Sequence, residues 1–185
     1  MARKNGPWTI NESHLEFQND HLQLWEDEVT QPDGKPGRYA TVRRGEGVCI
    51  LPVDEEGNAY LVQQFRYALG KDSLEVVSGA IRAQEQPQDA ARREASEELG
   101  LEAASWTPLG CYQPDTSIVY NPVHLFLARN LSFHEPHREG SEAMHKVRLP
   151  LEQAVQQALS GEISNLVSAF LLLKAAKMLE EDEIV

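Results

Sequence analysis

Cysteine, positive charge and long apolar runs are all scarce in this chain of 185 residues. Its two cysteines, Cys49 and Cys111, are too few for a disulfide framework or a zinc cluster, and both lie in apolar stretches that predict buried free thiols. The longest apolar run, residues 166–173, is much shorter than the roughly 20 residues that span a bilayer. No apolar run follows the basic residues at the N-terminus, as a secretory signal would require. These absences favour a soluble protein of the cytoplasm.

Positive charge is outnumbered, because 17 lysines and arginines stand against 29 aspartates and glutamates, for a net charge of −12. A chain this acidic is repelled by a phosphate backbone and by an anionic membrane surface. Neither a nucleic acid nor a membrane is therefore an expected partner. A bound divalent cation can still reverse the local charge, so a small polyanionic substrate stays compatible with this composition.

Apolar periodicity predicts strands that are interrupted by one central helix and followed by two C-terminal helices. Strands are expected at residues 21–30, 39–42, 47–53, 59–66, 74–77, 106–112, 123–129 and 144–149, and helices at 87–99, 151–159 and 165–179. This order predicts an α/β (α+β) fold in which helices cover both faces of a mixed sheet. Residues 1–45 are expected to form a small antiparallel β region, residues 46–180 the main domain and residues 181–185 an acidic tail.

The central helix is unusual because it gathers acidic side chains on one face. Glu94, Glu97 and Glu98 are three and four residues apart, a spacing that brings like charges together and destabilises a helix. Glu97 and Glu98 also lie in the last turn, where the helix dipole is negative. Violations of local rules are expected mainly at functional sites, and a hard divalent cation would compensate for this one. A solvated acidic face is the alternative. An apolar stripe that can pack on a sheet is formed by Ala91, Ala95 and Leu99.

The acidic helix belongs to a longer pattern that starts at Gly79. Five residues follow Gly79, then Glu85, then seven residues, and then the run Arg-Glu-Ala-Ser-Glu-Glu-Leu-Gly-Leu, which ends at Leu101. This pattern resembles the signature of the Nudix hydrolases, G-x5-E-x7-R-E-U-x-E-E-x-G-U, where U is a bulky aliphatic residue. Only the first U differs, because Ala95 stands there. The resemblance covers roughly residues 47–179 and implies a Nudix-type α-β-α sandwich with a mixed sheet.

The resemblance also implies a metal site and catalytic roles. The ligands implied for Mg²⁺ or Mn²⁺ are Glu94, Glu97, Glu98 and the backbone carbonyl of Ser78. Arg93, paired with Glu85, would hold the carboxylates in place, and Arg93 and Glu97 are counted among the catalytic residues. A general base is implied in the loop before the last strand, where Glu142 is favoured over Glu139.

Residues that flank the pattern resemble one branch of the family, the ADP-ribose and nucleoside diphosphate sugar pyrophosphatases. These residues are Arg44-Gly45, Gln64-Phe65-Arg66, Leu74-Glu75 and the stretch 161–165. The branch implies hydrolysis of a diphosphate bond, with ADP-ribose as the first substrate and a nucleoside monophosphate and a sugar phosphate as products. GDP-mannose and NADH are alternative substrates. A nucleotide-sugar sensor without turnover is an alternative of another class, although a pure binding domain has no need of three converging carboxylates.

Substrate contacts and assembly follow from the same resemblance. Arg66, with Arg44, is the candidate for binding the diphosphate, because a guanidinium can hold two phosphate oxygens at once. An ordinary ion pair at a strand end is the alternative for Arg66. Trp25 is the candidate for stacking on a nucleobase, as against a core or dimer contact. The branch has an N-terminal strand region that builds an intertwined homodimer, so residues 1–45 are expected to form a dimer contact and part of the substrate site.

Overall fold

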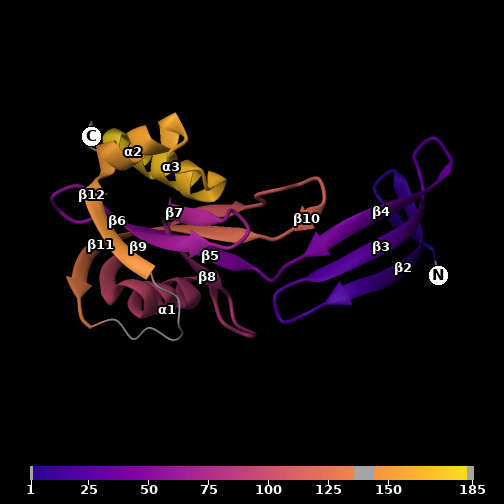
Figure 1. Cartoon of the computed structure of the whole chain (residues 1–185), viewed down its shortest axis with the longest axis horizontal. Coiled ribbons are helices and arrows are strands. Elements are labelled where there is room, and N and C mark those ends of the chain that lie inside the picture. The colour runs from indigo at the N-terminus through magenta and orange to yellow at the C-terminus, as the bar shows by residue number, and fades with distance from the viewer. Residues whose placement is uncertain (1, 136–143, 183–185) are drawn as a thin grey trace. The chain divides into compact units, whose positions relative to one another are not determined.

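The computed structural model describes residues 2–135 and 144–182 (Figure 1). The chain divides into two compact units, one of residues 1–46 and 113–122 and the other of residues 47–112 and 123–185. Within the described ranges, no helix combines the length and the apolar character that crossing a membrane requires.

The first unit is built on a five-stranded sheet with the strand order β1-β2-β3-β4-β10. Its strands are β1 (Arg3–Asn5), β2 (Trp8–Gln18), β3 (Gln23–Thr30), β4 (Pro36–Arg43) and β10 (Val119–Tyr120). Strands β1 to β4 pair antiparallel, whereas β10 pairs parallel with β4. The strands expected at 21–30 and 39–42 are confirmed as β3 and β4. Strand β2 was missed because the β2–β3 register shifts twice, and each shift breaks the two-residue alternation that marks a strand.

The second unit contains two sheets, with the orders β8-β5-β11-β9 and β12-β6-β7. Its strands are β5 (Gly47–Pro52), β6 (Asn58–Arg66), β7 (Lys71–Glu75), β8 (Val77–Ala80), β9 (Leu101–Tyr112), β11 (Val123–Phe133) and β12 (Met144–Pro150). Its helices are α1 (Pro87–Leu99), α2 (Leu151–Ser160) and α3 (Leu166–Asp182). The first of these sheets is mixed, because β5 pairs parallel with β11 and antiparallel with β8.

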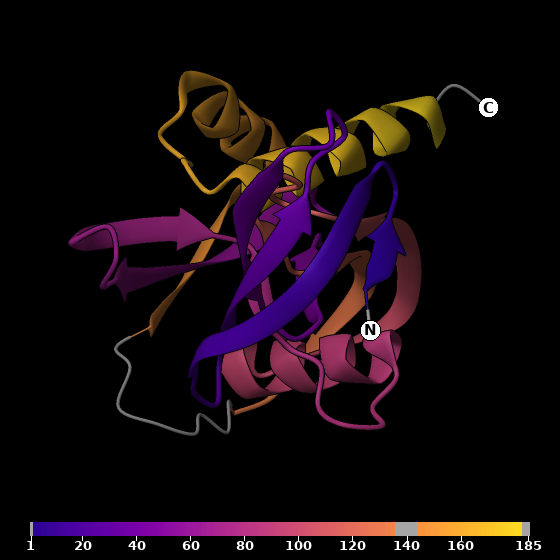
Figure 2. The ribbon, with the colours of Figure 1, turned by 90° about the vertical axis from the view of Figure 1, so that its right-hand side faces the viewer.

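Helices cover both sides of these strands, with α1 on one side and α2 and α3 on the other (Figures 1 and 2). Strand β5 shows how the sequence produces the two layers, since neighbouring strand residues point to opposite faces. Val48 and Ile50 join the core cluster of α1, whereas Cys49 and Leu51 join the cluster of α2 and α3. The expected α/β sandwich with a mixed sheet is therefore confirmed. The apolar stripe of α1 is confirmed as well, since its buried residues are Ala90, Ala91, Ala95 and Leu99.

Two details differ from the expectations. Cys49 is buried as a free thiol, but Cys111 is exposed. The β9–β11 register shifts next to Leu125, which pairs with Gly110 while the following residue pairs with Pro108, and β9 is an edge strand of its sheet. This bulge changes which residues of β9 face the core. The strand expected at 74–77 is instead the end of β7 and the start of β8, which are separated at Val76. The N–H of Val76 donates to Ser168 Oγ at 3.2 Å rather than to a neighbouring strand.

Candidate active site

Helix α1 carries the acidic residues, and its sequence fixes both of its ends. Pro87 occupies the first turn, where its missing N–H costs no helical hydrogen bond, and Asp89 complements the positive end of the helix dipole. Gly100 ends the helix in the left-handed conformation at φ 61°, which glycine adopts readily. The helix therefore ends at Leu99, and Glu97 and Glu98 lie in its last turn.

Arg93 ties α1 to the preceding loop. Its Nε donates to Glu85 Oε1 at 2.8 Å, and its Nη2 donates to Glu85 Oε2 at 3.0 Å and to the carbonyl of Ala80 at 2.9 Å. The hydrogen bonds from Arg93 lower the pKa of Glu85 to about 2. Glu85 is therefore ionised at neutral pH, and this charged, two-point contact fixes the guanidinium plane.

The remaining nitrogen of Arg93 holds two of the candidate metal ligands. Its Nη1 donates to Glu94 Oε1 at 2.6 Å and to Glu97 Oε2 at 3.1 Å. Arg82 adds a second positive charge, with its Nη2 3.5 Å from Glu97 Oε1. Burial raises the pKa of Glu94 despite the opposing effect of Arg93. Two carboxylates therefore converge on one cationic nitrogen, next to the half-buried Glu98 on the same helix.

Gly79 lets Glu94 lie directly against strand β8. A Cβ atom added to Gly79 would stand 1.9 Å from Glu94 Cδ, far inside any allowed contact. The neighbouring Ser78 pairs with Cys49 across β5 and β8. The carboxylate of Glu94 is therefore seated against strand β8 at Gly79, the residue after Ser78, and only glycine leaves room for it.

These oxygens form a donor set of the chemistry that hard divalent cations prefer. Two observations fit a cation site. The carboxylate of Glu94 lies directly against Gly79, and the carboxylates of Glu94 and Glu97 both contact the positive guanidinium of Arg93. Among the described residues, no group of three His, Cys, Asp or Glu side chains is arranged so that it could hold a metal ion. The guanidinium of Arg93 supplies the counter-charge for Glu94 and Glu97 in this arrangement.

Arg66, at the end of β6, is bound along one edge by Glu75, at the end of β7. Arg66 Nε lies 3.0 Å from Glu75 Oε1, and Arg66 Nη2 lies 2.5 Å from Glu75 Oε2. The Glu75 side chain is only 3% exposed, against 36% for Arg66. Burial opposes ionisation of Glu75, but hydrogen bonds from Arg66 and Ser73 outweigh it and lower its pKa. Glu75 therefore fixes the guanidinium of Arg66. Sequence reasoning assigned it no role, although it stands in one of the stretches that carry the family resemblance.

The other candidate substrate residues belong to the first unit. The backbone N–H of Arg44 donates to the Tyr120 carbonyl at 2.9 Å, and the residue lines an open pocket of about 400 Å³ together with Arg43. Trp25 donates from its Nε1 to Gln23, and the guanidinium of Arg43 lies 5.0 Å from the centre of the indole ring. The candidate general bases, Glu142 and Glu139, fall outside the described residues.

Comparisons with known proteins cover most of the chain, including helix α1. The NUDIX domain model matches residues 43–177. The ADP-ribose pyrophosphatase of Bacillus subtilis (strain 168) is 30% identical over 156 residues, which cover 83% of this chain and 84% of that protein. The ADP-ribose pyrophosphatase of Mycobacterium tuberculosis is 30% identical over 149 residues, covering 78% of this chain and 72% of that protein. The crystal structure of an ADP compounds hydrolase shares the fold, with a TM-score of 0.86 at 20% identity over 99% of this chain and 100% of that one.

The mixed sheet between helices, with a glycine-bearing strand β8 that leads through a loop into the glutamate-rich helix α1, lies within the residues that match the NUDIX domain model, which describes a family of hydrolases. The chain belongs to the Nudix family. It is a Nudix pyrophosphatase, and its similarity to ADP-ribose pyrophosphatases extends over most of its length. Nudix hydrolases generally use divalent metal ions, which agrees with the oxygen donors gathered on α1.

Proposed function

We propose that this protein hydrolyses the diphosphate bond of nucleoside diphosphate sugars in the presence of Mg²⁺ or Mn²⁺, with ADP-ribose as the preferred substrate. The products are a nucleoside monophosphate and a sugar phosphate. The observation that carries the proposal is that Arg93, itself held by Glu85, binds the carboxylates of Glu94 and Glu97. Glu94 also lies against strand β8, where only a glycine at position 79 leaves room for it. Two relatives that are named ADP-ribose pyrophosphatases support the choice of substrate.

The proposed metal ligands are Glu94, Glu97, Glu98 and the carbonyl oxygen of Ser78. A bound divalent cation would neutralise charge on the diphosphate and lower the pKa of a bound water. The protein's own contribution is orientation, because Arg93 fixes two of these carboxylates and is itself fixed by Glu85. Ligating carboxylates depend on such partners for their position.

Arg66 is the proposed contact for the diphosphate, and Glu75 presents its guanidinium plane at the end of β6. Arg44 is a second proposed phosphate contact, and Trp25 is the proposed stacking partner of the base. Glu142 is the proposed general base, with Glu139 as the alternative. A homodimer in which residues 1–45 contribute to the substrate site completes the proposal.

The test is release of AMP from ADP-ribose with Mg²⁺, compared between the wild type and Glu98→Gln. The variant should lose activity by about 100-fold or more, since even outer partners of metal ligands contribute about 10- to 100-fold. Glu102→Gln is the matched control, because it removes the same charge from an exposed position on β9. Undiminished AMP release by Glu98→Gln would overturn the mechanism, and tight binding of ADP-ribose without turnover by the wild type would indicate a sensor. GDP-mannose and NADH, assayed in parallel, settle the preferred substrate.

A further inference from the structure

The chain passes from one sheet of the second unit to the other at Val76. Strand β7 pairs with β6 up to Glu75, and β8 pairs with β5 from Val77 onward, so Val76 belongs to neither ladder. Val76 is 1% exposed, and a buried backbone N–H outside a ladder needs another acceptor. Its acceptor is the hydroxyl oxygen of Ser168 on α3, 92 residues further along the chain.

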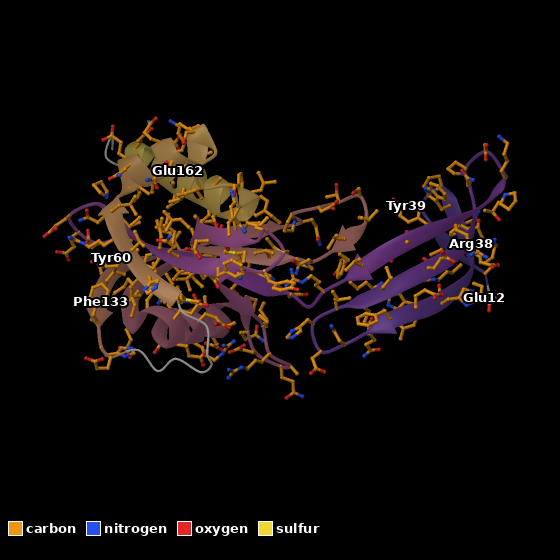
Figure 3. All side chains as sticks on the ribbon, viewed as in Figure 1. Glu12, Arg38, Tyr39, Tyr60, Phe133 and Glu162 are labelled. Carbon is orange, nitrogen blue, oxygen red and sulfur yellow. The ribbon has the colours of Figure 1, made fainter. Side chains whose placement is uncertain are left out.

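Asn165 holds the Ser168 hydroxyl in the orientation that this contact needs. Asn165 directly precedes α3, in the turn after α2 that is marked by Glu162 in Figure 3. Its Oδ1 caps the helix by accepting the backbone N–H of Ser168 at 2.9 Å, and it accepts the Ser168 hydroxyl at 3.0 Å. With its hydrogen directed to Asn165, the hydroxyl has a lone pair free for the N–H of Val76. The start of α3 is therefore tied to the break between β7 and β8.

This break lies between the two parts of the proposed site. The residue before Val76 is Glu75, which binds the guanidinium of Arg66, the proposed diphosphate contact. After Val76, strand β8 runs to Gly79, against which the carboxylate of Glu94 lies. A backbone shift at Val76 would therefore displace the diphosphate contact relative to the proposed metal ligands.

We infer that Asn165 and Ser168, acting through the N–H of Val76, position the diphosphate contact relative to the metal ligands. The inference rests on the proposed function, because it concerns the same site. Ser168 is 2% exposed, so removal of its hydroxyl would leave the N–H of Val76 buried and unpaired, a cost that the backbone can avoid only by moving. Asn165 also ends the stretch 161–165, which carries part of the family resemblance and had no assigned role.

Steady-state hydrolysis of ADP-ribose with Mg²⁺, at a temperature at which every variant is folded, separates positioning from stability. Ser168→Ala and Asn165→Gly should lower kcat by about tenfold or more with a smaller change in KM, because the substrate still finds each contact but the two are no longer aligned. Asn165→Asp keeps the accepting oxygen and should retain most of the wild-type kcat. Ala175→Gly is the matched control, because it destabilises the buried side of the same helix but takes no part in these hydrogen bonds. It should leave kcat unchanged.

Amide hydrogen exchange of the same proteins, measured by NMR without metal, tests the hydrogen bond itself. The exchange rate of the Val76 N–H is compared with that of Ile50, which lies in β5 between two paired strands. This ratio should rise by about tenfold or more in Ser168→Ala, because local opening at Val76 no longer breaks a hydrogen bond. It should stay at the wild-type value in Ala175→Gly and in Asn165→Asp.

The inference is overturned if Ser168→Ala and Ala175→Gly have the same kcat, or if the exchange ratio of Val76 does not rise in Ser168→Ala. If Ser168→Ala fails to fold, Asn165→Gly decides, because glycine is itself a helix-capping residue and keeps α3. A kcat of Asn165→Gly equal to that of Asn165→Asp then overturns the inference. Failure of the proposed function looks different, since the wild type itself would release no AMP from ADP-ribose, and the inference would fall with it.

Discussion

Among single residues, Gly79 is the one whose missing side chain shapes the proposed metal site most directly. We expect Gly79→Ala to lower kcat for ADP-ribose by about 100-fold, because a displacement of about 1 Å at a reacting group can cost that much. The added Cβ would stand 1.9 Å from Glu94 Cδ, so the carboxylate must move away from β8. Steady-state kinetics measures the effect, and urea unfolding of the same variant shows whether the fold survives. A folded variant with wild-type kcat would contradict the role given to this contact.

Arg66 and Glu75 form a second contact whose loss has a definite energetic signature. Arg66→Met should lower the free energy of unfolding by about 3 kcal/mol, because it leaves the carboxylate of Glu75 buried without its charge partner. The double variant Arg66→Met/Glu75→Met should recover most of that loss, since two apolar side chains need no pairing. Urea denaturation of the wild type, both single variants and the double variant gives the coupling energy. If the double variant is as unstable as Arg66→Met alone, the loss of stability does not come from the unpaired carboxylate of Glu75.

At the scale of elements, α1 was predictable from sequence to its last residue, because its signals are local. Pro87 and Gly100 mark its ends, and the apolar and acidic faces repeat with the helical period. The pairing of Arg66 with Glu75 was not predictable, because it depends on the register of β6 against β7, which places residues 66 and 75 on one face. The bulges in β2 and β9 were hidden for the same reason, since a bulge is defined by the partner strand rather than by the chain itself.

The two glycine C-caps allow the helix that carries the site to be distinguished from a purely structural helix. Gly100 ends α1 at φ 61° and Gly161 ends α2 at φ 80°, so an alanine at either position is strained. Both Gly100→Ala and Gly161→Ala should lower the free energy of unfolding by about 1 kcal/mol. Only Gly100→Ala should also lower AMP release, because it disturbs the turn that carries Glu97 and Glu98. Thermal unfolding and a kinetic assay check both parts, and equal kinetic effects of the two substitutions would contradict the distinction.

In the turn between β5 and β6, the ionised side chain of Asp54 should contribute to stability at neutral pH, and this contribution should disappear in acid. Asp54 accepts hydrogen bonds from the backbone N–H of Asn58 at 2.8 Å and from Arg148 Nη2 at 2.8 Å. Burial opposes ionisation, but these bonds outweigh it and lower the pKa of Asp54 from 3.8 to about 2. Because the pKa is lower in the folded state, the charged form stabilises the fold above pH 3.8, and this stabilisation is lost as the pH falls toward 2.

Asp54→Asn should therefore cost roughly 1 to 2 kcal/mol at pH 7 and progressively less as the pH is lowered through this window. Urea unfolding of wild type and variant at a series of pH values measures the difference directly. Glu55→Gln, in the same turn but exposed, is the control and should show no such convergence. A constant difference between wild type and Asp54→Asn at all pH values would contradict the role of the charge.

At the scale of the whole molecule, the net charge of −12 has two separate consequences. Self-repulsion destabilises any chain this acidic, and every added salt relieves it by screening. A specific cation site adds a second, saturable stabilisation, because a ligand that binds only the folded state raises its stability by mass action. The sequence identified the acidic helix and, through the family resemblance, Arg93 as the residue that holds its carboxylates, and Arg93 pairs with Glu94 and Glu97 in the described arrangement.

These two effects of charge separate in a thermal unfolding experiment. At about 100 times its dissociation constant, Mg²⁺ should stabilise the fold by about 2.7 kcal/mol, which for a chain of this size raises Tm by roughly 5 to 10 °C. Sodium chloride of equal ionic strength should give only the screening part, and EDTA should remove the specific part. Glu98→Gln should abolish the specific part, while Glu102→Gln keeps it. If all three proteins respond to Mg²⁺ no more than to sodium chloride, the cation acts on the charge of the whole chain rather than on a site at α1.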